Sequence, residues 1–451
     1  MNKHTDIPTI YSLSSGAGIA GVAVIRISGT RAGECLKLMC RKPVEPGHTA
    51  LRKIFHPITK TLLDEGLVLW FPAPGSFTGE DIVEFQIHGG RASIMAVVEA
   101  LSNIDSYRQA EAGEFTRRAF QNGRLDLVEI EGLGDLIHAQ TEAQRRQALN
   151  QSEGVASEVF NNWRKELIGV LGYLEASIDF IEEEDVNDNA LAGFRDKLIH
   201  LRNDMEKHLT DGVRGEVVRD GVRVVLAGEP NVGKSSIINW LARRDVAIVS
   251  DVPGTTRDVL EVQLDLDGIP VTISDTAGLR DVAGDEVERQ GIARTKEAGY
   301  RADLLIWIVA GDQAGADLLL DSDAEKLVVM NKIDLAQQNT TRRNSGERNS
   351  GALPVSAKTG EGMDELMEKI SARVLVMFGG KEPALITRER QKSALAMCIE
   401  CLDGALDEET GSLELTAEQL RMAANHLGRL VGRIDVEDLL DVIFRDFCVG
   451  K

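Results

Sequence analysis

The sequence of 451 residues lacks long hydrophobic runs, has few cysteines and is poor in basic residues. Its longest apolar runs, such as Leu304–Ala310, fall far short of the ~18 residues that a membrane-spanning helix needs. The first residues, MNKHTDIPTIYSL, hold no apolar stretch of signal-peptide length. The five cysteines are odd in number and scattered, which excludes a disulfide framework. We therefore expect a cytoplasmic protein without membrane spans.

The shortage of basic residues limits how this chain can bind nucleic acid. Its 51 Lys and Arg face 72 Asp and Glu, which gives a formal net charge of −21. Because proteins bind nucleic-acid phosphates mainly through Lys and Arg, this balance argues against a large nucleic-acid-binding surface. We expect any contact with a polyanion to be local or made through a partner. The apolar and charged fractions, 43% and 27%, exclude a disordered or collagen-like chain.

Length and composition predict about three domains, at roughly 150 residues each. Residues 1–120 are rich in glycine and short apolar runs, which predicts an α+β domain. Residues 121–218 and 379–451 have helical patterns, whereas 219–378 alternate strands and helices as a doubly wound α/β domain does. We predict that the α/β domain is inserted into one discontinuous helical bundle domain. Two separate helical bundles are the alternative.

A phosphate-binding loop is indicated by Gly228-Glu-Pro-Asn-Val-Gly-Lys-Ser235, which matches G-x-x-x-x-G-K-[ST]. The segment follows the apolar run Val222–Ala227 and precedes a helical pattern, the context that the motif requires. Backbone N–H groups of such a loop bind phosphate oxygens, its lysine bridges the β- and γ-phosphates, and its serine ligates Mg²⁺. A glycine-rich turn before an unrelated helix is the alternative.

Further elements follow in the order typical of GTPases. They are Gly254-Thr-Thr-Arg-Asp258, then Asp275-Thr-Ala-Gly278 after a hairpin with the turn Asp267-Gly268, then Asn331-Lys-Ile-Asp334 and Ser356-Ala-Lys358. An aspartate in the Asn-Lys-x-Asp element can accept two hydrogen bonds from guanine, so we predict GTP rather than ATP. The order resembles the GTPase family, and we predict an inserted Ras-like P-loop GTPase domain.

The predicted GTP contacts lie in these elements and beside them. They are Asn231, Val232, Gly233, Lys234, Ser235, Ser236, Ser250, Asp251, Val252, Pro253, Gly254, Thr255, Thr256, Asp275, Thr276, Ala277, Gly278, Asn331, Lys332, Asp334, Ser356, Ala357 and Lys358. Ser235 and Thr256 are the predicted Mg²⁺ ligands.

The predicted catalytic residues differ from those of Ras-like GTPases. Ras-like GTPases have a water-orienting glutamine directly after Asp-x-x-Gly, but here Leu279 stands at that position. A monovalent cation beside the phosphates can replace the missing group, and Asn231 and the loop 250–255 offer oxygen ligands for it. Glu288 can polarise water as a general base. The alternative interpretation of Glu288 is a solvated helix residue.

Motifs over nearly the whole chain resemble the MnmE (TrmE) family of tRNA-modification GTPases. They include Gly21-Val-Ala-Val-Ile-Arg-Ile-Ser-Gly29, Phe77-Thr-Gly-Glu-Asp81, Glu84, His88-Gly-Gly90, Gly113-Glu-Phe-Thr-Arg-Arg-Ala-Phe120, Asn122-Gly-Arg-Leu-Asp126 and Cys448-Val-Gly-Lys451. The sequence departs from the family at Ser14-Ser15, where Pro-Pro is common, at Ala112, where a proline is usual, and at Arg124, where lysine is frequent.

The resemblance implies an N-terminal domain that dimerises and binds a one-carbon tetrahydrofolate, in the 5-formyl or 5,10-methylene form, through Arg26, Glu84, Arg124 and Lys451. It implies K⁺-dependent dimerisation of GTPase domains, with K⁺ bound by Asn231, Ser250, Val252 and Thr255, and Glu288 as general base. It also implies a homodimer that forms a heterotetramer with the FAD-containing MnmG (GidA) protein. Together they would modify C5 of the wobble uridine of certain tRNAs with an aminomethyl or carboxymethylaminomethyl group, and most tRNA contacts would come from MnmG.

Two cysteine features call for separate interpretations. Cys448 lies near Lys451, which can lower the thiol pKa, so Cys448 is either a catalytic thiol or a packing residue. Cys398 and Cys401 form a lone C-x-x-C on a predicted helix, with no second pair to complete a metal site. We interpret them as small core residues.

Two other functions compete with tRNA modification. A ribosome-assembly GTPase would share the GTPase elements but carry a basic RNA-binding appendage. Residues 379–451 instead contain 9 Lys and Arg against 14 Asp and Glu, a net charge of −5. A purely regulatory interaction module would not need the complete metal and guanine elements. Both alternatives are therefore weaker than tRNA modification.

Overall fold

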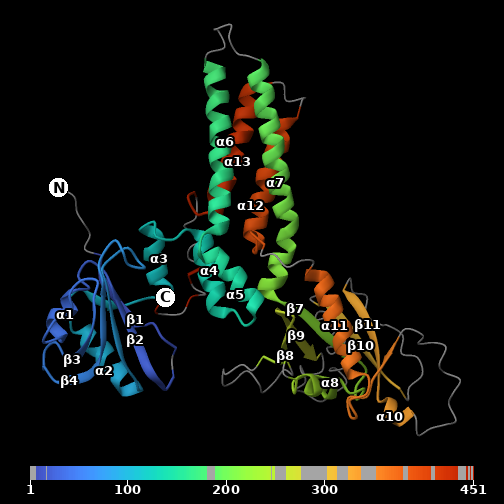
Figure 1. The fold of residues 1–451 in the computed structure, drawn as a ribbon, viewed down its shortest axis with the longest axis horizontal. Helices are drawn as coiled ribbons and strands as arrows, with labels where there is room; N and C mark the ends of the chain where they lie inside the picture. The colour runs from blue at the N-terminus through green and yellow to red at the C-terminus, as the bar shows by residue number, and fades with distance from the viewer. Residues whose placement is uncertain are drawn as a thin grey trace, which may run out of the picture. The chain divides into compact units, whose positions relative to one another are not determined.

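The computed structural model describes residues 7–16, 18–179, 188–244, 246–248, 261–275, 302–311, 324–336, 352–378, 384–407 and 412–434, with Ile443, Phe444, Phe447 and Gly450 (Figure 1). The chain divides into two compact units. The first comprises 1–134, 151–198 and 400–451, and the second comprises 135–150 and 199–399. None of the described helices combines the length and apolar character needed to span a membrane.

A six-stranded sheet forms the N-terminal part of the first unit, in the order β3-β4-β5-β2-β1-β6. One face buries alternate apolar residues such as Ile25, Ile27, Val83 and Phe85, which pack against α1 and α2. The elements are β1 Thr9–Leu13, β2 Ala20–Ser28, α1 Glu34–Met39, β3 Thr49–Phe55, β4 Leu62–Phe71, β5 Ile82–Gly89, α2 Arg91–Ser102, β6 Tyr107–Gln109 and α3 Glu114–Gln121. This is the expected α+β fold.

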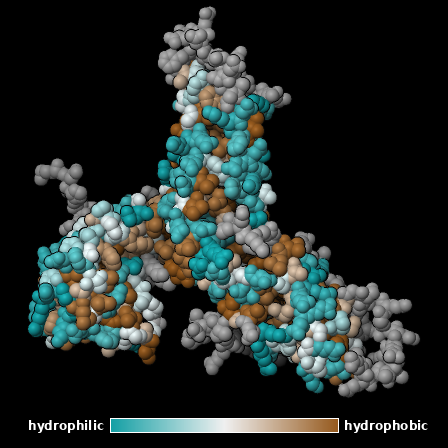
Figure 2. Space-filling model, in the orientation of Figure 1, coloured by the Kyte–Doolittle hydropathy of each residue, from teal (hydrophilic) through white to brown (hydrophobic). Residues whose placement is uncertain are grey.

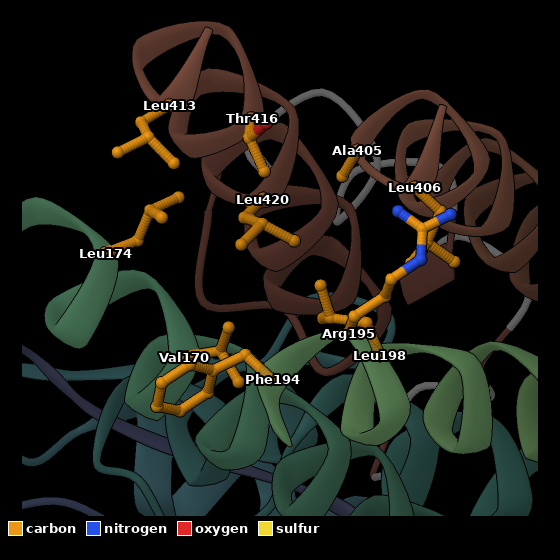
Figure 3. A pocket seen from close by; sticks show the side chains of 10 residues that line it. All are labelled: Val170, Leu174, Phe194, Arg195, Leu198, Ala405, Leu406, Leu413, Thr416 and Leu420. Carbon is orange, nitrogen blue, oxygen red and sulfur yellow. The ribbon is translucent and has the colours of Figure 1, made fainter. Parts of the chain in front are cut away.

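Helices from both sides of the inserted segment pack together. They are α4 Leu127–His138, α5 Glu142–Ser152, α6 Val155–Asp179, α7 Asp188–Asp220, α12 Glu389–Leu406 and α13 Leu413–Leu430. Along α6, Leu167, Val170 and Leu174 are buried at helical spacing, and α13 lies beside this helix. A cavity of 310 Å³ is lined by side chains of α6, α7, α12 and α13 (Figure 3). The predicted discontinuous helical bundle is therefore confirmed.

The inserted part forms a second six-stranded sheet, in the order β12-β11-β10-β7-β9-β8. All pairs are parallel except β8 with β9. All seven residues of β10 are buried, as expected for a parallel strand covered on both faces. The elements are β7 Val222–Gly228, α8 Lys234–Leu241, β8 Glu261–Leu266, β9 Ile269–Asp275, β10 Leu304–Ala310, β11 Glu325–Asn331, α10 Ile333–Ala336, β12 Leu353–Pro354 and α11 Met363–Phe378.

The predicted β8–β9 hairpin is present, and its turn approaches α5. Asp267 and Gly268 have φ of +55° and +91°, the left-handed values that a tight two-residue turn requires. A Cβ atom on Gly268 would lie 3.3 Å from the Cβ of Ala143, near the start of α5. The Ser371 hydroxyl of α11 donates to Asp267 Oδ2 at 3.2 Å. The hairpin turn therefore lies between α5 and α11.

A cluster of ion pairs joins α4, the end of α7 and the segment before α12, all within the second unit. Arg388 Nη2 donates to Asp135 Oδ1 at 2.6 Å, and Arg219 Nε lies 3.6 Å from the same oxygen. Arg219 Nη1 also donates to the carbonyl of Thr387 at 3.2 Å. We call Asp135, Arg219 and Arg388 the Asp135 cluster. It fixes the two places where the chain enters and leaves the α/β part.

Candidate nucleotide site

The loop between β7 and α8 has a backbone that only glycine tolerates at two positions. A Cβ on Gly228, whose φ is +149°, would lie 2.3 Å from the carbonyl oxygen of Ile308. A Cβ on Gly233, whose φ is +101°, would lie 2.3 Å from Asn331 Nδ2. Helix α8 begins directly after Gly233, so the amide groups of its first turn face the loop. Such an N-terminus attracts phosphate.

Lys234 and Ser235 open this helix and are held by polar contacts. The Lys234 ammonium is nearly buried and donates to the carbonyl oxygens of Gly228 and Glu229 at 2.9 and 3.0 Å. The Ser235 hydroxyl donates to Asp275 Oδ2 at 3.0 Å. Asp275 reaches it because parallel pairing of β7 with β9 places Leu226 opposite Asp275. A serine hydroxyl beside a carboxylate offers the hard oxygen ligands that Mg²⁺ prefers.

Asn331 ties the phosphate loop to the Ser-Ala-Lys segment. Its side chain is buried; Nδ2 donates to the carbonyl of Val232 at 2.8 Å, and Oδ1 accepts from the Ala357 N–H at 3.1 Å. Lys332 has φ of +66°, and its ammonium donates to the backbone carbonyl of Asn231. The residue that the Asn-Lys-x-Asp pattern predicted as a GTP contact thus also holds three distant segments together.

Asp334 is oriented by a hydrogen bond from the same Ser-Ala-Lys segment. The Ser356 hydroxyl donates to Asp334 Oδ1 at 2.7 Å and accepts from the Thr359 N–H at 3.2 Å. Ser356 is fully buried, so this arrangement is well shielded from water. The hydrogen bond from Ser356 therefore fixes the orientation of the Asp334 carboxylate.

The described residues account for only part of the predicted site. The described members lie at the ends of β7, β9, β11 and β12 or in the loop or first helical turn that follows: Asn231 to Ser236, Asp275, Asn331, Lys332, Asp334 and Ser356 to Lys358. The predicted contacts in 250–256 and 276–278, including Ser250, Val252, Thr255 and Thr256, lie outside the described residues, as do Leu279, Glu288, Cys448 and Lys451. Their roles stay predictions.

The first unit holds a second group of predicted residues. Arg26 and Glu84 face each other across β2 and β5, and Arg26 Nε donates to Glu84 Oε1 at 2.8 Å. The Arg26 guanidinium lies 5.5 Å from the ring centre of Phe77. Gly79, two residues after Phe77, packs closely against the Arg124 side chain, because a Cβ on Gly79 would lie 3.1 Å from the Cγ of Arg124. The Phe77–Asp81 segment therefore brings Arg26, Glu84 and Arg124 into one neighbourhood.

Gly450, in the C-terminal segment that the family resemblance assigns to the folate site, contacts residues at the end of β1. The Ser14 hydroxyl donates to the carbonyl of Gly450 at 2.6 Å. Gly450 has φ of +109°, and a Cβ there would lie 2.0 Å from the carbonyl oxygen of Leu13. Strand β1 pairs Ser12 with Arg26. Leu13 and Ser14, which Gly450 contacts, thus lie one and two residues along the chain from Ser12, the partner of Arg26.

A buried ionic network supports the Phe77–Asp81 segment, and sequence reasoning missed it. Arg118 is 5% exposed and donates to Glu80 Oε2 and Glu114 Oε1, both at 3.0 Å. Burial alone raises the pKa of Glu114, but hydrogen bonds from Arg108, the Glu111 N–H and Arg118 bring it below its usual value. The ionised carboxylate therefore stabilises the fold at neutral pH, and this stabilisation is lost as the pH falls through the lowered pKa.

Cys398 and Cys401 are confirmed as core residues. Both are buried on α12, and the Cys398 Sγ lies 3.8 Å from the Met205 sulfur. Burial raises the pKa of the Cys401 thiol. Within the described part of the chain, no group of three or more His, Cys, Asp or Glu side chains is arranged to hold a metal ion.

Comparison with known proteins identifies the family. Residues 9–124 match the family described as "GTP-binding protein TrmE N-terminus", and residues 127–448 match "MnmE helical domain". The chain belongs to the MnmE family. The tRNA modification GTPase MnmE of Parvibaculum lavamentivorans is 48% identical over 448 residues, which cover 98% of this chain and all of that protein.

Other MnmE-family relatives match over similar lengths. MnmE of Rhodopseudomonas palustris strain BisB18 is 46% identical over 99% of this chain and 100% of that protein. The mitochondrial 5-taurinomethyluridine-[tRNA] synthase subunit GTPB3 of Danio rerio is 44% identical over 98% of this chain and 93% of that protein. The resemblance predicted from the motifs is confirmed, and so is the predicted fold class.

Proposed function

We propose that this chain is a GTP-hydrolysing enzyme that takes part in tRNA modification. The observation that carries the proposal is the joining of the phosphate loop, Asp275, Asn331 and Asp334 in one site of an MnmE-family chain. Relatives along the full length are named tRNA modification GTPases. The relatives' names and the site chemistry support the same activity.

The described residues have separable roles in this reaction. The Lys234 ammonium, now bonded to loop carbonyls, is placed to pair with the β- and γ-phosphates of GTP. Asp334 accepts hydrogen bonds from the guanine edge. Ser235, together with Thr256, would hold Mg²⁺, which supplies positive charge against the phosphates when bound. These residues would bind and orient GTP, but none of them would activate the attacking water.

We propose that the attacking water is activated with the help of a cation, whose ligands are Asn231 and residues outside the described part of the chain. Leu279 stands where a glutamine would orient the water, so a cation bound by Asn231, Ser250, Val252 and Thr255 would supply the missing positive charge. We assign K⁺ to this position because backbone and amide carbonyl oxygens are suitable ligands for it. Closure of two GTPase domains against each other would complete the cation site.

Replacing Glu288 by alanine tests its assignment as the general base. We expect GTP binding to persist and the single-turnover hydrolysis rate to fall at least tenfold, which corresponds to roughly 1.4 kcal/mol of activation free energy. Rapid-quench measurement of GDP formation checks the rate, and titration with a fluorescent GTP analogue checks binding. An unchanged hydrolysis rate would return Glu288 to the role of a solvated helix residue.

The N-terminal part is proposed to bind a one-carbon tetrahydrofolate, in the 5-formyl or 5,10-methylene form. Arg26, Arg124 and Lys451 would pair with the folate carboxylates, and Glu84 would accept hydrogen bonds from the pterin ring. The Arg26–Glu84 hydrogen bond, the approach of Arg124 to Gly79 and the contact of Gly450 with Ser14 support this assignment. Cys448, three residues before the C-terminus, would then lie near the one-carbon group, as a catalytic thiol or as a packing residue.

A substitution at Gly450 tests whether the docked tail contributes to folate binding. Gly450→Ala places a Cβ 2.0 Å from the Leu13 carbonyl oxygen at a φ of +109°, so the tail must leave its position. We expect affinity for 5-formyltetrahydrofolate, measured by calorimetry, to fall at least tenfold while GTP hydrolysis is unchanged. Gly47→Ala is the matched control, since its φ is +77° but no atom lies within 4 Å of the new Cβ. Equal affinities of wild type and Gly450→Ala would contradict the proposed role.

We further propose that a cytoplasmic homodimer of this chain acts with the FAD-containing MnmG (GidA) protein. Together they would add an aminomethyl-type group to C5 of the wobble uridine. Mass spectrometry of wobble-uridine nucleosides from cells that lack this chain tests the proposal. Loss of the C5 modification is expected. Intact modification would exclude this function and leave a ribosome-assembly GTPase as the alternative.

A further inference from the structure

The N-terminal domain carries a local excess of positive charge in a strongly acidic chain. Residues 31–60 contain seven Lys and Arg against two Asp and Glu, a net charge of +5, whereas the remaining residues carry 44 against 70, a net of −26. This segment comprises α1, the loop after it, the edge strand β3 and the turn into β4. The charge is therefore concentrated at one edge of the N-terminal sheet.

Backbone pairing gathers these side chains on the sheet edge. Cys40 forms an isolated antiparallel bridge with Ile54, which continues the sheet beyond β3 and places Arg41 and Lys42 beside Lys53 and Arg52. Arg52 Nε donates to the carbonyl of Lys42 at 2.7 Å, so these two residues are in direct contact.

The turn into β4 adds another cation to the same edge. Lys60 Nζ donates to the carbonyl of Leu38 at 3.2 Å, one residue after Lys37 on α1. The Arg41 guanidinium stacks on Phe55, 4.5 Å from its ring centre. We call Lys37, Arg41, Lys42, Arg52, Lys53 and Lys60 the basic edge.

The basic edge faces solvent, and Glu65 of β4, opposite Lys53, is an acidic cross-strand neighbour. Five of its six side chains are exposed and Arg52 is half-buried. Among the described residues, no carboxylate forms an ion pair with any of the six. Figure 2 shows hydrophilic side chains along the margin of the domain that holds α1 and β3. Elsewhere in this unit arginines are paired with carboxylates, as Arg26 and Arg118 are. An excess of cations without ion-pair partners along one edge suits the phosphates of a nucleic-acid backbone.

We propose that the basic edge binds the phosphate backbone of the tRNA. The inference rests on the proposed function for the identity of the RNA. It adds a tRNA-binding surface on this chain to the contacts assigned to the partner protein. The contact would be with phosphates rather than bases, because lysines and arginines on an exposed edge fix position without reading sequence. Protection of an edge strand from aggregation is the competing explanation for lysines at this place.

Charge reversal at two residues of the basic edge tests the proposal. Neither the Lys42 nor the Lys53 side chain forms a hydrogen bond or ion pair within the described part of the chain, although Lys53 faces Glu65 across β3 and β4. Lys42→Glu with Lys53→Glu therefore reverses both charges without breaking such a bond. In the full chain, we expect affinity for a labelled tRNA transcript at 50 mM KCl to fall at least tenfold. The slope of log K against log salt concentration should become shallower by about 1.6, the value for two lost phosphate contacts.

Two controls separate this surface from general effects of charge. Lys165→Glu with Lys207→Glu changes the net charge equally at exposed positions on α6 and α7, and its tRNA affinity should match that of the wild type within about twofold. Lys42→Arg with Lys53→Arg keeps both cations and should also bind normally. Basal GTP hydrolysis of every variant should equal the wild-type rate, and an unchanged circular dichroism spectrum and thermal midpoint show that each is folded.

Each other outcome overturns the proposal. Undetectable binding of tRNA to the wild-type chain, or equal loss in the Lys165/Lys207 control, excludes the basic edge as an RNA-binding surface. If the Lys42/Lys53 variant binds tRNA as tightly as the wild type, the lysines serve to protect the edge strand from aggregation instead. Binding to phosphatidylserine vesicles in place of tRNA assigns the surface to a membrane. A separate experiment would contradict the proposed function: intact wobble-uridine modification in cells that lack this chain.

Discussion

Replacing Asp334 by asparagine should lower affinity for GTP at least a hundredfold and raise affinity for xanthosine triphosphate. In the proposed GTP complex the carboxylate would accept two guanine N–H groups, and Ser356 holds it in place through a 2.7 Å hydrogen bond. In Asp334→Asn, an amide N–H₂ group would face one guanine donor and could not accept from it. Loss of a charged hydrogen bond costs about 1.5–3 kcal/mol, and a hundredfold change corresponds to about 2.7 kcal/mol.

The xanthine base makes this prediction specific. Xanthine carries a carbonyl where guanine carries its amino group, so the asparagine amide can donate to it. Competition titrations with a fluorescent GTP analogue measure both affinities. Asp364→Asn is the matched control, because it neutralises an exposed carboxylate of the same domain that pairs with Arg244. A general loss of affinity for both nucleotides would mean that Asp334 supports the fold rather than reading the base.

GTP hydrolysis should be at least tenfold faster in KCl than in NaCl at equal ionic strength. Leu279 cannot orient water, and an arginine finger that supplies positive charge accelerates Ras about 10⁵-fold. A bound K⁺ would supply the comparable charge here, and carbonyl oxygens spaced for K⁺ would bind the smaller Na⁺ poorly. Steady-state phosphate release measures the difference. Equal rates in the two salts would exclude the potassium hypothesis.

A substitution at Asn231 assigns the cation effect to a residue. Asn231 has φ of +65°, which glycine adopts without strain, so Asn231→Gly removes the amide oxygen while keeping the loop shape. We expect its rate in KCl to fall to the rate in NaCl while GTP binding persists. Asn239→Ala removes an exposed amide from α8 in the same domain and should keep its K⁺ stimulation. Retained stimulation in Asn231→Gly would remove Asn231 from the ligand set.

Local patterns were sufficient for most of the α/β fold and the nucleotide site. The apolar run of β10, the Asp267-Gly268 turn and the glycines at 228 and 233 each impose their structure on a few neighbouring residues. Because the site residues follow strand ends, the parallel order of the strands places them on neighbouring loops. The sequence could therefore predict which of the described residues lie together at this edge of the sheet.

Contacts between distant positions could not be predicted in this way. The hydrogen bond from Ser14 to Gly450 spans 436 positions, and Arg118 reaches Glu80 across 38. Neither pair belongs to a local motif or a helical or strand periodicity. Asn331 was predicted from its motif, but its hydrogen bonds to Val232 and Ala357 depend on how β7, β11 and β12 align. Hydrogen bonds between residues so far apart in the sequence become visible only in the folded structure.

The approach of the β8–β9 hairpin to α5 has a mechanical consequence. The far end of this hairpin holds Asp275, about 20 Å from the Gly268 turn at the usual rise of a strand. Because hydrogen bonds pair the two strands along their length, we expect a displacement of Asp275 on nucleotide binding to be transmitted through the hairpin to Ala143. The Asp135 cluster holds the two segments through which the chain enters and leaves the α/β part. We therefore expect α5 to move in response, rather than these segments.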